Sequence, residues 1–75
     1  MFKINLNSIN SVKGFVNSAS AFSGDIELTS GRYTVDAKSI MGVFSLDLSK
    51  PVEVVVTPAD REAEFKKTVT EYIVK

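Results

Sequence analysis

The sequence predicts an α+β domain in which three helices cover one face of a four-stranded antiparallel sheet. Four segments alternate apolar and polar residues with a period of two, which is typical of strands that bury one face. Other segments place apolar residues three and four positions apart or begin with a good helix-capping residue, which indicates helices. The order of these segments is β-α-β-β-α-β-α, and a chain of 75 residues is long enough for one domain only, residues 1–75.

The first strand is predicted where Phe2, Ile4 and Leu6 alternate with polar residues. The first helix follows, with Ser8 as its N-cap and Gly24 as a left-handed stop after its end. Its apolar stripe is expected to face the core and consists of Ile9, Val12, Phe15, Val16, Ala19 and Phe22.

A β-hairpin is predicted over residues 25–36, with its turn at Ser30-Gly31, because glycine adopts a positive φ without strain. The alternation places four residues of the hairpin on the core face: Ile26, Leu28, Tyr33 and Val35. The next stretch, KSIMGVFSL, covers residues 38–46 and is about two helical turns long, with Ser39 at the helix start.

The last strand and the last helix complete the pattern. Val52, Val54 and Val56 alternate with other residues and predict the fourth strand. Thr57-Pro58 marks the start of the final helix, with threonine as N-cap and proline in the first helical position. The apolar stripe of this helix is formed by Phe65, Val69, Tyr72 and Ile73.

The composition excludes several classes of site. The chain has no cysteine, and it has no histidine, which is the commonest general base and metal ligand. The acidic residues are scattered, so we expect no bound metal or other cofactor. Nine basic and nine acidic residues cancel without forming a basic run, so we expect no nucleic-acid partner.

A membrane partner is also not expected. No apolar run approaches the roughly 20 residues that a membrane-spanning helix needs. The beginning of the chain, MFKINLN, is too short and too polar for a signal peptide. These features predict a cytoplasmic protein.

Residues 34–56, TVDAKSIMGVFSLDLSKPVEVVV, resemble the HPr family, the small histidine-containing phosphocarriers of the bacterial sugar phosphotransferase system. The resemblance extends back without a gap through FVNSASAFSGDIELTSGRY, residues 15–33. It implies the open-faced β-sandwich of that family, which agrees with the pattern above. It also implies a non-enzymatic protein that is a monomer and binds other proteins.

The start of the first helix departs from the family. Members that carry phosphate have a G-x-H-A-R-P motif there, and an ungapped count places residues 6–11, LNSINS, at the same position. Ser8 then stands where the phosphorylated histidine would be, and Asn10 where the arginine would be. A serine phosphate is a stable ester and a poor relay donor, and Ser8 has no activating base. We expect Ser8 to be a helix N-cap and not a catalytic residue; a phosphorylated Ser8 is the alternative.

The family resemblance assigns a second serine a role. In many members from low-GC Gram-positive bacteria, the serine of K-S-I-M-G is phosphorylated by HPr kinase/phosphorylase, and the modified form binds a catabolite-control transcription regulator. Ser39 is the matching residue, and a helix N-terminus favours an added anion. The alternative is that Ser39 is an ordinary N-cap, and the two roles are compatible.

In the family, the helix that follows this serine exposes apolar side chains to which other phosphotransferase-system proteins, the kinase and the regulator dock. The candidate partner-binding residues are therefore Ile40, Met41 and Phe44, with Lys13 of the first helix at their rim. The alternative is that a small core recruits these apolar residues. Lys38 is expected to be a solvated charge.

These inferences predict an HPr-like regulatory or protein-binding module that has no histidine phosphocarrier activity and is regulated by phosphorylation at Ser39. Two alternatives stay open. The protein is a phosphocarrier of the sugar phosphotransferase system, as the family name implies, or it is a structural or interaction module that is never phosphorylated.

Overall fold

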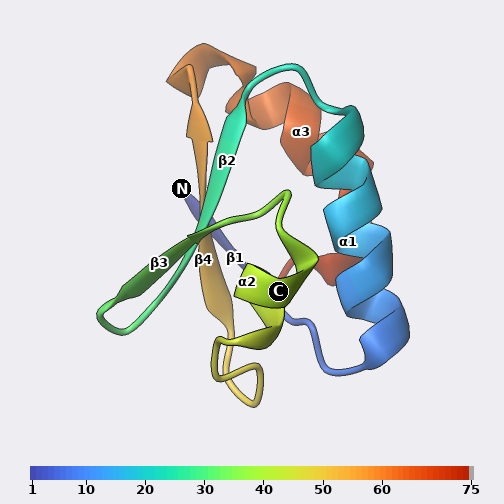
Figure 1. Cartoon of the computed structure of the whole chain (residues 1–75). Coiled ribbons are helices and arrows are strands. Elements are labelled where there is room, and N and C mark those ends of the chain that lie inside the picture. Colours follow the sequence, from blue (N-terminus) through green and yellow to red (C-terminus); the bar gives the residue numbers. More distant parts are fainter. Residues whose placement is uncertain (75) are drawn as a thin grey trace.

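A computed structural model describes residues 1–74 and confirms the predicted α+β architecture and its order β-α-β-β-α-β-α (Figure 1). The strands are β1 (Phe2–Ile4), β2 (Asp25–Ser30), β3 (Tyr33–Asp36) and β4 (Val52–Thr57). The helices are α1 (Ile9–Ala21), α2 (Ile40–Phe44) and α3 (Glu62–Thr68). Two short 3-10 helices, η1 (Ala59–Arg61) and η2 (Thr70–Tyr72), flank α3.

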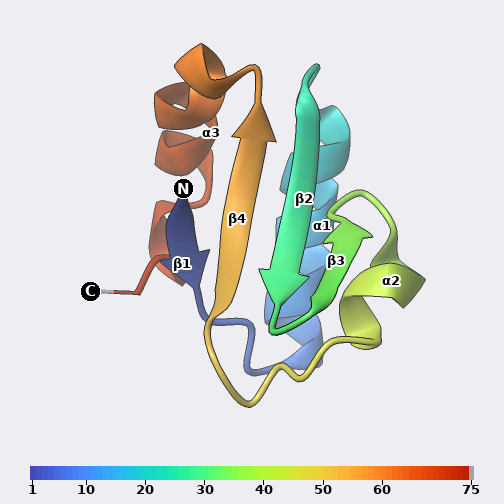
Figure 2. The same cartoon turned by 90° about the vertical axis from the view of Figure 1, so that its left-hand side faces the viewer.

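The four strands form one antiparallel sheet in the order β1-β4-β2-β3. Figure 2 shows this sheet from its open face, with α1 behind it. The outer edge of β1 is partly covered by the C-terminal segment, because Ile73 forms an isolated bridge with Ile4 and Asn5 donates its N–H to the Tyr72 carbonyl at 2.8 Å. Strand β3 forms the other edge, next to α2.

The core lies between the sheet and the helices. Alternation along β2 and β4 buries Ile26, Leu28, Val52, Val54 and Val56, as predicted. Phe15 of α1 and Phe65 of α3 are fully buried, and their rings meet edge to face with centroids 5.7 Å apart. This aromatic contact joins the two longer helices over the sheet.

Two predicted core residues are exposed instead. Ile9 is 63% exposed, because it is the first residue of α1 and lines an open groove described below. Tyr33 is 72% exposed, because its partner Ser30 is the last residue of β2 and the pair closes the hairpin at the sheet edge. A periodic pattern identifies a face, but only the packed layers decide how far that face is covered.

The two glycines that were expected to shape turns act differently. Gly31 has a φ of 60°, as predicted, and the hairpin turn is Gly31-Arg32. Gly24 does not adopt a left-handed conformation; the C-cap of α1 is Phe22, in an extended conformation. Gly24 is required by space, because a Cβ atom there would lie 2.8 Å from the carbonyl oxygen of Thr57.

The final helical region also differs from the prediction. Thr57 is the last residue of β4 and is not an N-cap; η1 begins after Pro58 without any side-chain cap. Tyr72 lies in η2, and Ile73 follows it in an extended conformation that pairs with β1. Within residues 1–74, no helix combines the length and apolar character needed to cross a membrane.

Candidate functional site

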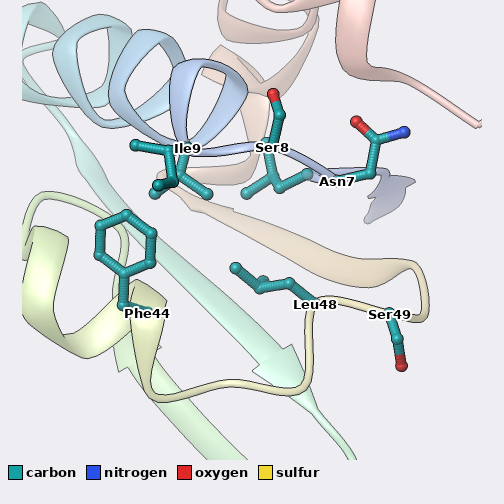
Figure 3. A pocket seen from close by; sticks show the side chains of 8 residues that line it. Asn7, Ser8, Ile9, Phe44, Leu48 and Ser49 are labelled. Carbon is teal, nitrogen blue, oxygen red and sulfur yellow. The ribbon is translucent and has the colours of Figure 1, made fainter.

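An apolar groove of about 400 Å³ lies between the start of α1 and the end of α2 (Figure 3). The eight residues that line it are all uncharged: Leu6, Asn7, Ser8, Ile9, Val12, Phe44, Leu48 and Ser49. In Figure 3, the Phe44 ring and the Leu48 side chain point toward the start of α1, where Ile9 forms the opposite wall. Leu6 and Val12 are each only 1% exposed and belong to the core beneath the groove.

Ser8 is the N-cap of α1, as predicted, and its hydroxyl is engaged in a capping box. Its Oγ accepts a hydrogen bond from the Ser11 backbone N–H at 3.1 Å, and the Ser8 N–H donates to Ser11 Oγ, also at 3.1 Å. Ser11 Oγ also contacts the Ser8 carbonyl oxygen, as a donor at 2.9 Å. The Ser8 hydroxyl points away from Phe44 and Leu48 (Figure 3). Its oxygen therefore serves the helix and not the groove.

Asn10 lies in the first turn of α1, is exposed, and does not line the groove. Ser8 and Asn10, the two residues that the ungapped count singled out, thus do not converge on the groove. Ser8 contributes to its edge, whereas Asn10 lies outside it.

Ser39 is exposed and is the N-cap of α2, as the sequence predicted. Its Oγ accepts a hydrogen bond from the Gly42 N–H at 3.3 Å. At the other end of the helix, Ser45 Oγ donates to the Gly42 carbonyl oxygen at 2.5 Å. Because a helix of five residues has little intrinsic stability, these two caps on one residue help to define it.

The predicted partner-binding residues do not all share one environment. Met41 is 77% exposed and Phe44 is 42% exposed, whereas Ile40 is half-buried and packs against the core. Met41 and Phe44 therefore fit the prediction of an exposed partner-binding surface, whereas Ile40 fits the alternative of recruitment into the core. Lys13 is exposed on α1, one turn after Ile9, and does not line the groove.

Sequence reasoning missed two residues of this surface, Ile9 and Leu48. Ile9 has the spacing of a core residue, so periodicity gave no signal for its exposure. Leu48 lies in the loop after α2, where an apolar residue between polar neighbours was the available signal. We call the five residues Ile9, Ile40, Met41, Phe44 and Leu48 the apolar patch.

A hydrogen-bonded loop holds Leu48 at the groove. The Asp47 carboxylate accepts from Ser49 Oγ at 2.5 Å and from the Ser49 N–H at 3.1 Å. These hydrogen bonds keep the pKa of Asp47 below its ordinary value of 3.8, and Lys50 adds a smaller attraction. The two ends of the turn are thereby fixed on either side of Leu48.

The comparisons with known proteins assign this architecture. A family model described as "PTS HPr component phosphorylation site" matches residues 5–73. This chain belongs to the HPr family. It is similar to the crystal structure of HPr-C-His from Thermoanaerobacter tengcongensis, with 31% sequence identity, 95% of this chain and 83% of that chain covered, and a TM-score of 0.75. A comparison with curated proteins finds no match.

HPr-family proteins are phosphocarriers that interact with other proteins of the phosphotransferase system, and they are not enzymes in the usual sense. The groove and both serines of this HPr-family chain lie within the matched residues. Over residues 1–74, the structure brings no group of three or more His, Cys, Asp or Glu side chains together as metal ligands. The candidate site is an apolar groove with polar residues among its lining, next to two helices whose N-caps are Ser8 and Ser39.

Proposed function

We propose that this HPr-family protein is a regulatory, protein-binding module that cannot relay a phosphoryl group through histidine. The observation that carries the proposal is the absence of histidine from the whole sequence. Ser8, at the expected histidine position, uses its hydroxyl in the capping box with Ser11. A serine phosphate is a stable ester, so phosphorylation of Ser8 would not restore a relay donor.

The apolar patch is the docking surface in this proposal. Ile9, Met41 and Phe44 are large apolar side chains that remain exposed, and exposed apolar patches mark interaction sites. The groove between Ile9 and Phe44 carries no charge, so a partner side chain can enter it without desolvating an ion. Lys13, which is exposed on α1, is the candidate for a rim contact. The expected partners are HPr kinase/phosphorylase, a catabolite-control regulator or other phosphotransferase-system proteins, bound by a cytoplasmic monomer.

Ser39 is the switch in this proposal. Ser39 is exposed, so a kinase can reach its hydroxyl. The hydrogen bond that its Oγ accepts from the Gly42 N–H is long, at 3.3 Å. A phosphate would add about −1.5 to −2 charges next to Ile40 and Met41, and would thus change the electrostatics of docking more than the fold.

The proposal is tested by incubating the protein with ATP and an HPr kinase, followed by intact-mass measurement. We expect one added phosphate in the native sequence and in Ser20→Ala, at an exposed serine of α1, and none in Ser39→Ala. Absence of the added mass in the native sequence removes the switch and leaves only the docking role. Partner binding that is unchanged by Ser39→Ala would favour the module that is never phosphorylated.

The phosphocarrier alternative is tested with labelled phosphoenolpyruvate and enzyme I. We expect no label on this protein under conditions in which a histidine-containing HPr is labelled fully. An acid-labile label on the purified protein would contradict the proposal and favour the carrier.

A further inference from the structure

We propose that Lys38 is a positioning residue for the apolar patch. The sequence predicted that Lys38 is a solvated charge, but Lys38 is half-buried. Its Nζ donates a hydrogen bond to the Phe22 carbonyl oxygen at 3.0 Å. These two residues are 16 positions apart in the chain. The hydrogen bond therefore joins the segment that leads into α2 to the C-terminal end of α1.

Helix α1 has no basic residue near the Phe22 carbonyl group that Lys38 contacts. Phe22 is the C-cap of α1, and the last turn of the helix contains no basic residue. The C-terminal end of a helix carries a partial negative charge on its unpaired carbonyl groups. Lys38 supplies the compensating ammonium from another part of the fold, as lysines near helix ends do.

The anchor itself is firmly held. The Phe22 ring packs on Phe65, with centroids 5.2 Å apart, and the Arg61 guanidinium lies 4.5 Å from the Phe22 ring centroid on its face. Arg61 also donates to Ser23 Oγ at 2.6 Å. Two cations from different elements thus converge on the end of α1, and Lys38 is tied to a point that is fixed against the core.

The backbone around Lys38 is fixed at the same time. The Lys38 N–H donates to the Asp36 carboxylate at 2.9 Å, and the Ser39 N–H donates to the Asp36 carbonyl oxygen at 3.0 Å. Helix α2 then starts from a turn whose two sides are held by β3 and α1. Within the helix, Val43 is buried and Ile40 is half-buried against the core, so the placement of α2 depends on these two contacts together with the hydrogen bonds at its start.

It follows that Lys38 acts on the apolar patch through α2 and not by touching a partner. This inference rests on the proposed docking function for its biological purpose, but its physical content concerns the free protein. Removal of the ammonium is expected to loosen α2, which carries Ile40, Met41 and Phe44, while the sheet stays intact.

The test is native-state amide hydrogen exchange, measured by NMR on the full chain. In Lys38→Met, which keeps the apolar stem, we expect the hydrogen-bonded amides of α2, such as Val43, whose N–H donates to the Ser39 carbonyl oxygen, to exchange about tenfold faster or more, as for the loss of a charged hydrogen bond. The amides of β4 are the internal reference and should change less. Lys67→Met, at an exposed lysine of α3, is the matched control and should leave α2 unchanged.

The conservative variant separates positioning from a general structural role. Lys38→Arg keeps a cationic donor and should return the α2 amides to within about threefold of the native rate, a small difference on the scale of one hydrogen bond. In the native protein, the Lys38 ammonium should give a ¹⁵Nζ signal that exchanges with water more slowly than that of Lys67.

Either of two outcomes overturns the inference: unchanged α2 exchange in Lys38→Met, or equal acceleration of α2 and β4, which would indicate global destabilisation only. The measurement needs no kinase and no partner. If Ser39 is not phosphorylated, the hydrogen-exchange result for Lys38 still stands. If Lys38→Met leaves α2 unchanged, the proposal for Ser39 still stands.

Discussion

Ile9 and Phe44 face each other across an uncharged groove, one from the first turn of α1 and the other from the last residue of α2 (Figure 3). Both side chains remain partly exposed, at 63% and 42%. The hairpin of β2 and β3 separates α1 from α2 in the chain, and the two helices nevertheless contribute the walls of one surface. The predictions below follow from this arrangement and from the contacts that support it.

Ile9 is expected to tolerate truncation although its spacing is that of a core residue. Ile9→Ala should lower the free energy of unfolding by less than about 1 kcal/mol, because most of its side chain is already in water. Phe15→Ala removes a fully buried ring and should cost about 3–5 kcal/mol. Urea denaturation of both variants measures the contrast. Similar losses for the two variants would mean that Ile9 is buried in solution.

Ser8 is expected to stabilise α1 as an N-cap. Ser8→Ala should cost about 1 kcal/mol, because the Ser11 N–H loses its acceptor. Ser8→Asp supplies another good capping oxygen, so its free energy of unfolding should lie within roughly 0.5 kcal/mol of that of the native protein. Ser20→Ala, at an exposed position of α1, is the control for chemical denaturation. If Ser8→Asp were as unstable as Ser8→Ala, capping would not explain the loss.

The two glycines at the ends of β2 should respond to substitution for different reasons. Gly24→Ala places a Cβ atom 2.7 Å from the Phe22 ring and 2.8 Å from the Thr57 carbonyl oxygen, and should cost about 1–3 kcal/mol. Gly31→Ala meets no atom within 4 Å, and its cost of about 1–2 kcal/mol should arise from the positive φ alone.

Asparagine distinguishes these two causes, because it tolerates a left-handed conformation. Gly31→Asn should therefore be more stable than Gly31→Ala, whereas Gly24→Asn should be no better than Gly24→Ala. Thermal or urea unfolding of the four variants provides the comparison. An equal benefit from asparagine at both sites would refute the steric account of Gly24.

The loop after α2 should show a defined pH response. Hydrogen bonds from Ser49 lower the pKa of Asp47 in the folded state, so their stabilising effect is present above the ordinary pKa of 3.8. This effect is lost as the pH falls through the lower, folded-state pKa of Asp47. Ser49→Ala should raise the pKa of Asp47 toward its ordinary value, as followed by NMR titration of the carboxyl carbon. Ser20→Ala is the control that should leave the titration of Asp47 unchanged.

The sequence was sufficient for the architecture because the relevant signals are local. Alternation in β2 and β4 identified the buried face, and Ser8 and Ser39 identified two helix starts, since capping depends on residues three positions away. The limits of the last helix were less predictable. Tyr72 and Ile73 continue an apolar spacing, but the pairing of Ile73 with Ile4 ends the helical region.

The amino-acid sequence by itself determined the strands, the starts of α1 and α2 and the absence of an imidazole, because each depends on neighbouring residues or on composition. Only the tertiary structure decided that Ile9 faces Phe44 and that the Lys38 ammonium reaches the Phe22 carbonyl. The physical reason is that exposure and long-range hydrogen bonds depend on which layers meet in space. Periodicity states which side of an element is apolar, and packing states whether anything covers that side.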